Sequence, residues 1–393
     1  GVVLGSKTLT LSNASGTYSG VIGGTGGLTL SAGTQTLTGA NTYTGATTVG
    51  GGTLQAGSAT AFGSGVITVA SGAVLDLNGQ TMTSTGGLTL NGTGISGGGA
   101  LINSSSTGAT YAGLVTLGSS TSIVGGAGTI ALSNAGTLSG SGFDLTLGGA
   151  AGGSIASIIG TGTGTVTKTG AGTWTLTAAN TYTGATTISD GKLALSGSGS
   201  IATSSGVLSS GTGVLDIAGT TSGATIAALS GSSSASTGVV LGSKTLTLSN
   251  ASGTYGGVIG GTGGGLTLSA GSQTLTGTNT YTGATTVSAG TLQVGDGSTG
   301  SLASGAAISV ASGAILALNQ GTGSVLSGNI ANSGALTFNR GDDVTYGGVI
   351  SGAGTVTQAG GGTTILTGAN TYSGVTTIAA GNLERSDAYA GVR

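Results

Sequence analysis

The most constraining feature of this 393-residue chain is that it repeats itself. A ten-residue string occurs at residues 40–49 as ANTYTGATTV and returns almost unchanged at residues 179–188, 278–287 and 369–378. A catalytic motif is needed once, whereas a structural unit is needed as often as there are units. The sequence therefore indicates a repeat protein in which each copy packs against its neighbours.

A longer duplication surrounds two of these copies. The string GVVLGSKTLTLSNASGTY fills residues 1–18 and recurs letter for letter at residues 238–255. The likeness continues through residues 1–57 and 238–295, with one inserted glycine in the second block. The four repeat motifs end near residues 56, 195, 294 and 384.

The local pattern has a period of two residues. In KTLTLS, Leu9 and Leu11 alternate with Thr8 and Thr10, which is typical of a β-strand with one buried face. Gly, Asn or Ser separates such runs, no proline interrupts them, and helical periodicity is nearly absent. Glycine accounts for 89 residues, but the hydrophobic content of 37% argues against a disordered glycine-rich linker.

Many short strands admit either an antiparallel sandwich or a parallel β-solenoid. A sandwich has one closed core and gains nothing from copying a segment, whereas a solenoid coil buries its face only against neighbouring coils. We therefore predict an all-β fold, a parallel β-helix (β-solenoid) built from internal repeats and continuous over residues 1–384. Leu383 still matches the repeat, so we expect residues 385–393 to form a terminal cap or junction.

Composition excludes several classes of function. The net charge is −2 with only seven Lys and Arg residues, so no basic patch for nucleic acid is expected. The apolar runs are too short for membrane insertion of this segment. The chain has no His and no Cys, and we expect no cofactor, no metal and no catalytic residue. It starts at Gly1 without a signal-peptide pattern, so we expect a fragment of something longer.

The segment VTKTGAGTWTLTAANTYTGATTISDGKLAL at residues 166–195 resembles the autotransporter-associated β-strand repeat, also called the passenger-associated transport repeat. Three further segments, ending near residues 56, 294 and 384, share the pattern. The family often has TGGTT where this chain has TGATT or SGVTT. The resemblance implies a right-handed parallel β-helix, secreted across the outer membrane of a Gram-negative bacterium and found at the cell surface or outside the cell.

Two groups of residues are candidate sites. The motif contributes one Asn and one Tyr in each copy, and the aromatic rings could either stack on a sugar or pack over their turns, which we favour. These structural motif residues are Asn41, Tyr43, Asn180, Tyr182, Asn279, Tyr281, Asn370 and Tyr372. Separately, Arg340-Gly341-Asp342 spells a tripeptide that integrin receptors bind, or else forms a charged solvent turn. The single tryptophan, Trp174, is expected in the core.

We expect a non-catalytic structural segment of a bacterial surface or extracellular fibre, serving adhesion or biofilm matrix. Self-association, end to end or lateral, is expected because open solenoid ends expose unpaired strands. The alternative is an adhesin that recognises a glycan or host-cell receptor through a lateral face or residues 340–342. Ice binding is less favoured because Lys168 interrupts the threonine array, and a polysaccharide-degrading enzyme because the carboxylates are dispersed.

Overall fold

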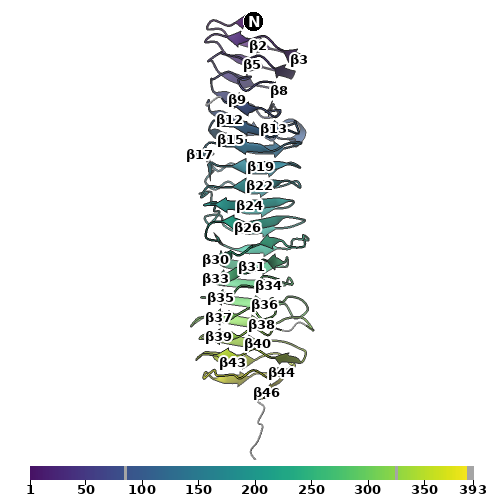
Figure 1. The fold of residues 1–393 in the computed structure, drawn as a ribbon, viewed down its shortest axis with the longest axis vertical. Coiled ribbons are helices and arrows are strands. Elements are labelled where there is room, and N and C mark those ends of the chain that lie inside the picture. Colours follow the sequence, from purple (N-terminus) through teal and green to yellow (C-terminus); the bar gives the residue numbers. More distant parts are fainter. Residues whose placement is uncertain (84–85, 324–325, 387–393) are drawn as a thin grey trace, which may run out of the picture. The chain divides into compact units, whose positions relative to one another are not determined.

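The computed structural model describes residues 1–83, 86–323 and 326–386. Among these residues the regular structure is β-strand, apart from one short 3-10 helix, η1 (Ile95–Gly97). The chain divides into two compact units, Gly1–Ser204 (unit 1) and Ser205–Arg393 (unit 2). Within each unit, successive short strands stack in parallel as the chain coils (Figure 1). The predicted all-β parallel solenoid is confirmed.

Unit 1 consists of three ladders of parallel strands, which the chain visits in turn. The first ladder contains β2 (Leu9–Leu11), β5 (Leu28–Leu30), β7 (Thr47–Val49), β9 (Ile67–Val69), β12 (Leu88–Gly92), the first part of β15 (Val115–Gly125), β17 (Thr137–Ser139) and β20 (Ile158–Gly160). The second ladder contains β3 (Ala14–Tyr18), β6 (Gly33–Leu37), β8 (Thr53–Ala56), β10 (Val74–Asp76), β13 (Leu101–Asn103), the second part of β15, β18 (Leu145–Gly148), β21 (Val166–Lys168) and β23 (Thr186–Ile188). The third ladder contains β11 (Thr81–Met82), β14 (Ala109–Tyr111), β16 (Ile130–Leu132), β19 (Gly152–Ile155), β22 (Thr173–Leu176) and β24 (Lys192–Gly197), and β1 (Val2–Val3) pairs separately with β4 (Ile22–Gly23).

Unit 2 repeats this arrangement. Its first ladder contains β27 (Ala224–Ile226), β30 (Thr245–Leu248), β33 (Gly265–Leu268), β35 (Thr285–Val287), β37 (Ile308–Val310), β39 (Ile330–Asn332) and β42 (Ile350–Ser351). Its second ladder contains β25 (Val207–Ser209), β28 (Leu229–Gly231), β31 (Ala251–Tyr255), β34 (Gly271–Leu275), β36 (Thr291–Val294), β38 (Ile315–Leu318), β40 (Ala335–Phe338), β43 (Thr355–Gln358) and β45 (Thr376–Ile378). The third group contains β26 (Val214–Thr220), β29 (Val239–Val240) and β32 (Ile259–Gly260), and, stacked together further along the chain, β41 (Val344–Tyr346), β44 (Thr363–Leu366) and β46 (Asn382–Arg385).

The alternation read from the sequence produces the core. In β5, Leu28 and Leu30 are buried while Thr29 between them is half-buried on the outer side. Leu30 pairs with Val49 of the next coil, a step of 19 residues, so apolar side chains lie directly above one another. Stacking of like on like buries an apolar column inside each unit without any contribution from helices. Trp174 lies inside this core, as predicted, with its indole Nε1 donating to Gly148 O at 2.9 Å.

Some corners can be built only from glycine. Gly33 and Gly52 occupy the same corner of successive coils, with φ of 80° and 74°. A Cβ on Gly52 would lie 2.0 Å from Gly33 O, and a Cβ on Gly33 would lie 2.0 Å from Ala14 O. Positive φ and close stacking of the backbone therefore act together at this corner to exclude any side chain.

The repeat motif does not keep to one ladder. In the first copy of unit 1, the LTL strand β5 and the TTV strand β7 lie in the first ladder. In the second copy, the equivalent strands β21 and β23 lie in the second ladder. The same change separates β33 and β35 from β43 and β45 in unit 2. The motif is therefore a packing unit that fits more than one ladder.

Candidate functional site

The asparagine of the repeat motif connects neighbouring coils. Asn41 is buried, and its Oδ1 accepts a hydrogen bond from the backbone N–H of Ile22 in the preceding coil at 2.8 Å. Its Nδ2 donates to the carbonyl of Ala61 in the following coil at 2.7 Å. The same acceptor bond recurs in every copy, from Ile159 to Asn180 (2.9 Å), Ile259 to Asn279 (3.0 Å) and Ile350 to Asn370 (2.8 Å). One side chain thus satisfies backbone groups at a corner where the strand pairing is interrupted.

The tyrosine of the motif points into the core. The Tyr43 hydroxyl lies 2.6 Å from Oγ1 of Thr47, and both side chains are fully buried. The equivalent pairs are Tyr182 with Thr186 (2.7 Å), Tyr281 with Thr285 (2.7 Å) and Tyr372 with Thr376 (3.0 Å). Burial raises the pKa of Tyr43 well above its usual value, and the hydrogen bond to Thr47 opposes this only in part.

This geometry bears on the two alternatives for the motif. The rings of Tyr43, Tyr182 and Tyr281 have no exposed surface, so no sugar can stack on them in the folded chain. Tyr372 makes the same hydroxyl contact but is only half-buried, because it belongs to the last coil described. The arrangement fits the structural role expected for these residues.

Two motif copies carry a polar side chain inside an apolar column. Lys168 replaces leucine in a column where Leu147 and Ile188 are its neighbours, and it is fully buried. Its Nζ donates to the carbonyls of Thr169 (2.7 Å), Gly170 (2.5 Å) and Asp190 (3.0 Å). Burial lowers the pKa of Lys168 to about 8, against the attraction of the Asp190 carboxylate. The ammonium group thereby satisfies the carbonyls of a glycine-rich turn.

Gln358 occupies the equivalent position in unit 2. It is fully buried between Phe338 and Ile378 in its column. Its Nε2 donates to Gly360 O at 2.9 Å and Gly362 O at 3.0 Å. Lys168 and Gln358 thus contact the carbonyl two residues ahead in the same way, one charged and one neutral.

The Arg340-Gly341-Asp342 tripeptide is held against the molecule. Arg340 is 3% exposed, and its guanidinium donates to both carboxylate oxygens of Asp342, at 3.0 and 2.7 Å. A further bond reaches Gly321 O at 3.2 Å. These bonds from Arg340 lower the pKa of the Asp342 carboxyl. Because its guanidinium is buried, Arg340 is not accessible to a receptor in this conformation.

Two of the acidic side chains, Asp76 and Asp343, accept local hydrogen bonds. Asp76 is buried and accepts from Gln55 Nε2 at 2.8 Å, from Ser104 Oγ at 2.6 Å and from the Asn78 N–H at 2.9 Å. Asp343 accepts from the Thr363 N–H at 2.7 Å. Within residues 1–83, 86–323 and 326–386, no group of three or more Asp, Glu, His or Cys side chains could hold a metal ion.

Sequence reasoning missed the partners of the motif residues. The threonine four residues after each tyrosine is its hydroxyl partner, and the isoleucine about 20 residues before each asparagine is the backbone partner. Both signals are visible in the sequence: the threonine is the first of the TT pair in TGATT or SGVTT, and the isoleucine ends a VI dipeptide after Tyr18, Tyr255 and Tyr346, or the Ile158-Ile159 pair in the second copy. Of the predicted terminal cap at 385–393, residues 387–393 lie outside the described part of the chain.

Comparison with known families identifies the repeated segments. Four segments, residues 30–56, 166–195, 268–294 and 356–384, match the model of the passenger-associated-transport-repeat family. Each contains one Asn and Tyr pair of the motif. No curated protein and no solved structure matches the chain. No helix in the described residues is long and apolar enough to cross a membrane.

Proposed function

We propose that this chain, which carries four passenger-associated transport repeats in a β-solenoid, is a non-catalytic structural segment of a bacterial surface or extracellular protein. It would lie outside the cell of a Gram-negative bacterium and serve adhesion or biofilm matrix by spacing or by forming a fibre. The repeats and the solenoid together make the chain similar to an autotransporter passenger, which supports a location beyond the outer membrane.

The observation that carries this proposal is where the repeated side chains point. In three copies the motif Asn and Tyr are buried; the Asn is hydrogen-bonded to the neighbouring coils and the Tyr hydroxyl to a threonine of its own coil. A recognition motif would present its recurrent aromatic and amide groups to solvent, as binding surfaces do. Here these groups stabilise the stack, so repetition extends a scaffold.

The location can be tested with one added thiol. The chain has no cysteine, and Thr10 is exposed, so Thr10→Cys introduces a single reactive site. We expect a membrane-impermeant maleimide to label this variant on intact producing cells as fully as after lysis. The unmodified chain is the control and should remain unlabelled. Labelling that requires lysis would place the chain inside the cell and exclude the proposed role.

The glycan or receptor alternative has its own test. Asp342→Ala removes the carboxylate of the tripeptide while leaving the repeat motifs intact. If lateral recognition through residues 340–342 contributes, adhesion of wild-type protein to host cells or to a glycan array should fall in this variant. Equal binding by both proteins would argue against recognition through residues 340–342 and would leave the scaffold function as the proposal.

A further inference from the structure

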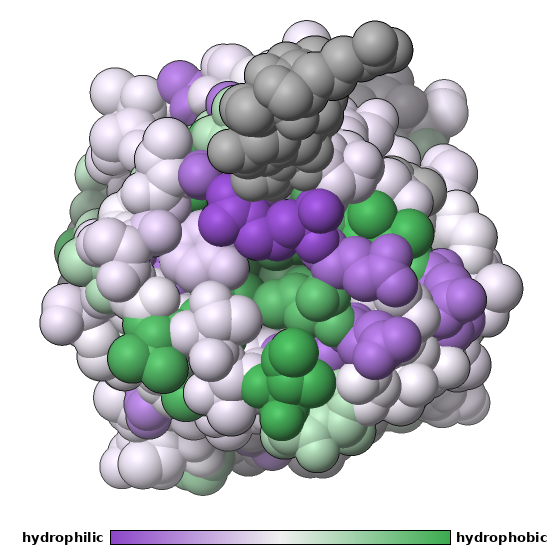
Figure 2. Space-filling model, turned by 90° about the horizontal axis from the view of Figure 1, so that it is seen from below, coloured by the Kyte–Doolittle hydropathy of each residue, from purple (hydrophilic) through white to green (hydrophobic). Residues whose placement is uncertain are grey.

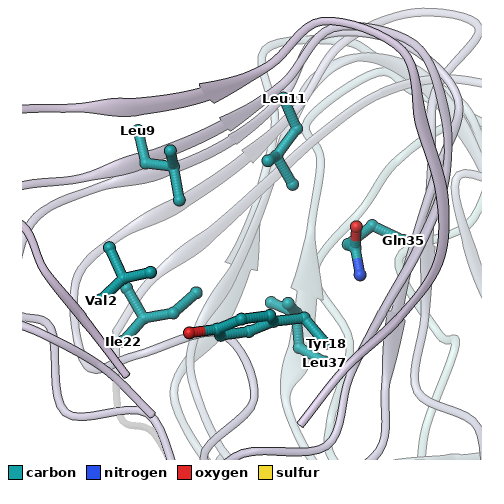
Figure 3. Close-up of a pocket in the computed structure, with 7 residues that line it drawn as sticks. All are labelled: Val2, Leu9, Leu11, Tyr18, Ile22, Gln35 and Leu37. Atoms are coloured by element: carbon teal, nitrogen blue, oxygen red, sulfur yellow. The ribbon is translucent and has the colours of Figure 1, made fainter. Parts of the chain in front are cut away.

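The first ladder of unit 1 carries a continuous column of threonines on its outer side. Leu9 and Leu11 of β2 point inward, beside the ring of Tyr18 (Figure 3), so Thr10 between them points outward. Parallel pairing in register repeats this position in the strands that follow in the ladder. The column consists of Thr10, Thr29, Thr48, Thr68, Thr89 and Thr116.

The protein leaves most hydroxyls of this column unused. Thr10, Thr68 and Thr116 are exposed, and the threonines between them are half-buried. Among the described residues, the five hydroxyls from Thr10 to Thr89 have no hydrogen-bond partner in the chain, and Thr116 contacts Ser139 Oγ at 3.3 Å. The column therefore presents hydroxyl groups to solvent at a regular spacing of about 4.8 Å, the distance between neighbouring strands.

The surroundings of the column are neutral and partly apolar. The residues two positions before and two positions after each threonine lie on the same side of the sheet. They are Gly, Ala, Val, Leu, Ser, Thr or Asn, so none is charged or aromatic. Val66 and Leu114 among them are 57% and 43% exposed. This outer side, which we call the threonine face, thus lacks the Trp, Tyr and Arg anchors that dominate binding between proteins.

The same column recurs on the first ladder of unit 2. Strands β27, β30, β33 and β35 place Thr225, Thr247, Thr267 and Thr286 in register. Ser309 of β37 continues the row of hydroxyls. Seen from the end of unit 2, most of the visible surface is pale in the hydropathy colouring, so strongly hydrophilic residues are confined to a few places (Figure 2).

Lys168 does not interrupt an outer array of threonines. In the sequence it follows Thr167, which was the reason for placing ice binding below the other functions. In the structure its side chain is fully buried and its ammonium group donates to backbone carbonyls. On the outer side of the same ladder, Thr167 pairs with Thr146 and Thr187. The sequence-based objection is therefore removed.

We propose that the threonine face binds the surface of ice. Equivalent oxygen atoms of ice repeat at a distance close to the strand spacing, so successive hydroxyls bond to successive water molecules of the lattice. The threonine methyl groups, Val66 and Leu114 leave liquid water in the same step. No charge on the face has to be desolvated. This activity is separate from the proposed scaffold function, and each can be tested without the other.

Uptake of the protein into a slowly growing ice crystal tests the proposal. We expect the ice to take up at least fivefold more of the wild-type chain than of a non-binding protein of similar mass. Thr29→Lys combined with Thr267→Lys places a charge in the column of each unit and should lower this uptake at least fivefold. The matched control is Thr34→Lys with Ser272→Lys, at exposed positions of the second ladder in the same two coils. It should change uptake less than twofold, with both variants retaining the wild-type circular dichroism.

Three outcomes would overturn the proposal. The wild-type chain could be excluded from ice like the non-binding protein, or the two lysine pairs could lower uptake equally. The wild-type chain could also self-associate and lose this association only in the Thr29 and Thr267 pair, which would assign the face to a second copy of the chain. A chain that is labelled on the cell surface yet excluded from ice would reject ice binding and leave the scaffold function standing.

Discussion

The hydroxyl of Tyr281 lies 2.7 Å from Oγ1 of Thr285, and both groups are sealed inside unit 2. The same pair, four residues apart, occurs in each of the other three motif copies. A buried hydroxyl without a partner is costly, so each side chain depends on the other. This mutual dependence can be measured by changing the two residues separately and together.

Tyr281→Phe should lower the free energy of local opening around this coil by about 1–2 kcal/mol, because the Thr285 hydroxyl loses its partner. Adding Thr285→Val should restore most of the loss, since both polar groups are then removed together. Hydrogen exchange followed by mass spectrometry gives the local opening free energy for each variant. Additive losses in the double variant would show that the two hydroxyls are not coupled.

Asn279→Ala removes the acceptor of the Ile259 N–H and the donor to Ser301 O. We expect a loss of about 1–2 kcal/mol in local stability, because the Ile259 N–H loses its acceptor in a buried corner, whereas Ser301 O keeps its hydrogen bond from the Asn279 backbone N–H. Amide exchange at Ile259 should accelerate most. Asn250→Ala is the control, because Asn250 is exposed, and it should leave this amide unchanged.

Gly52→Ala should strongly destabilise unit 1. The new Cβ would meet Gly33 O at 2.0 Å in a backbone with φ of 74°. Gly72→Ala is a matched control, since φ there is 80° but nothing lies within 4 Å of its Cβ. Gly72→Ala should lower the free energy of unfolding by about 1 kcal/mol, from backbone strain alone. Gly52→Ala should lower it by about 3 kcal/mol or more, because the new Cβ also overlaps the backbone of the neighbouring coil. Trp174 is the single tryptophan and lies in unit 1, so its fluorescence reports the urea unfolding of that unit. The unfolding midpoints of the two variants can therefore be compared directly. Equal losses would mean that the stacked carbonyl can move aside.

The buried ammonium of Lys168 should make unit 1 more stable as the pH rises. Its pKa is about 8 in the folded chain, below the ordinary lysine value, so the unfolded chain binds more protons between these two values. Unfolding therefore becomes less favourable above pH 8, by about 1.5 kcal/mol up to about pH 9.5.

Lys168→Gln is the matched variant for that measurement, because Gln358 makes equivalent carbonyl contacts in unit 2. Its urea midpoint, monitored through Trp174, should fall slightly towards pH 9.5, because unfolded tyrosines with a pKa near 10 begin to ionise there while buried tyrosines such as Tyr43 do not. The difference between the wild-type chain and the variant therefore isolates the contribution of Lys168. A wild-type midpoint that falls or stays constant over this pH interval would show that burial does not lower the pKa of Lys168.

Sequence reasoning reached the fold through residues such as Leu9 and Leu11, whose alternation with threonine defines a strand with one buried face. Four copies of the motif implied stacking, and the absence of a disulfide or charged network left backbone pairing and apolar packing as the stabilising forces. The structural assignment of Asn41 and Tyr43 followed from their repetition. The hydrogen-bond partners of these residues, Ile22 and Thr47, were not predicted from the sequence. In the case of Ile22, the coil length that brings it to Asn41 depends on every turn between them.

The sequence by itself determined the repeating unit, the strand alternation and the parallel stacking, because these depend on local pattern and on recurrence. Only the tertiary structure decided which ladder each motif copy occupies, since this depends on the number of strands between copies. It also decided that Arg340 lies inward on Asp342. Most directly, residues 1–18 and 238–255 are identical in sequence, yet Tyr18 is half-buried and Tyr255 fully buried. Identical residues differ in burial because a solenoid coil is completed by its neighbour rather than by its own sequence.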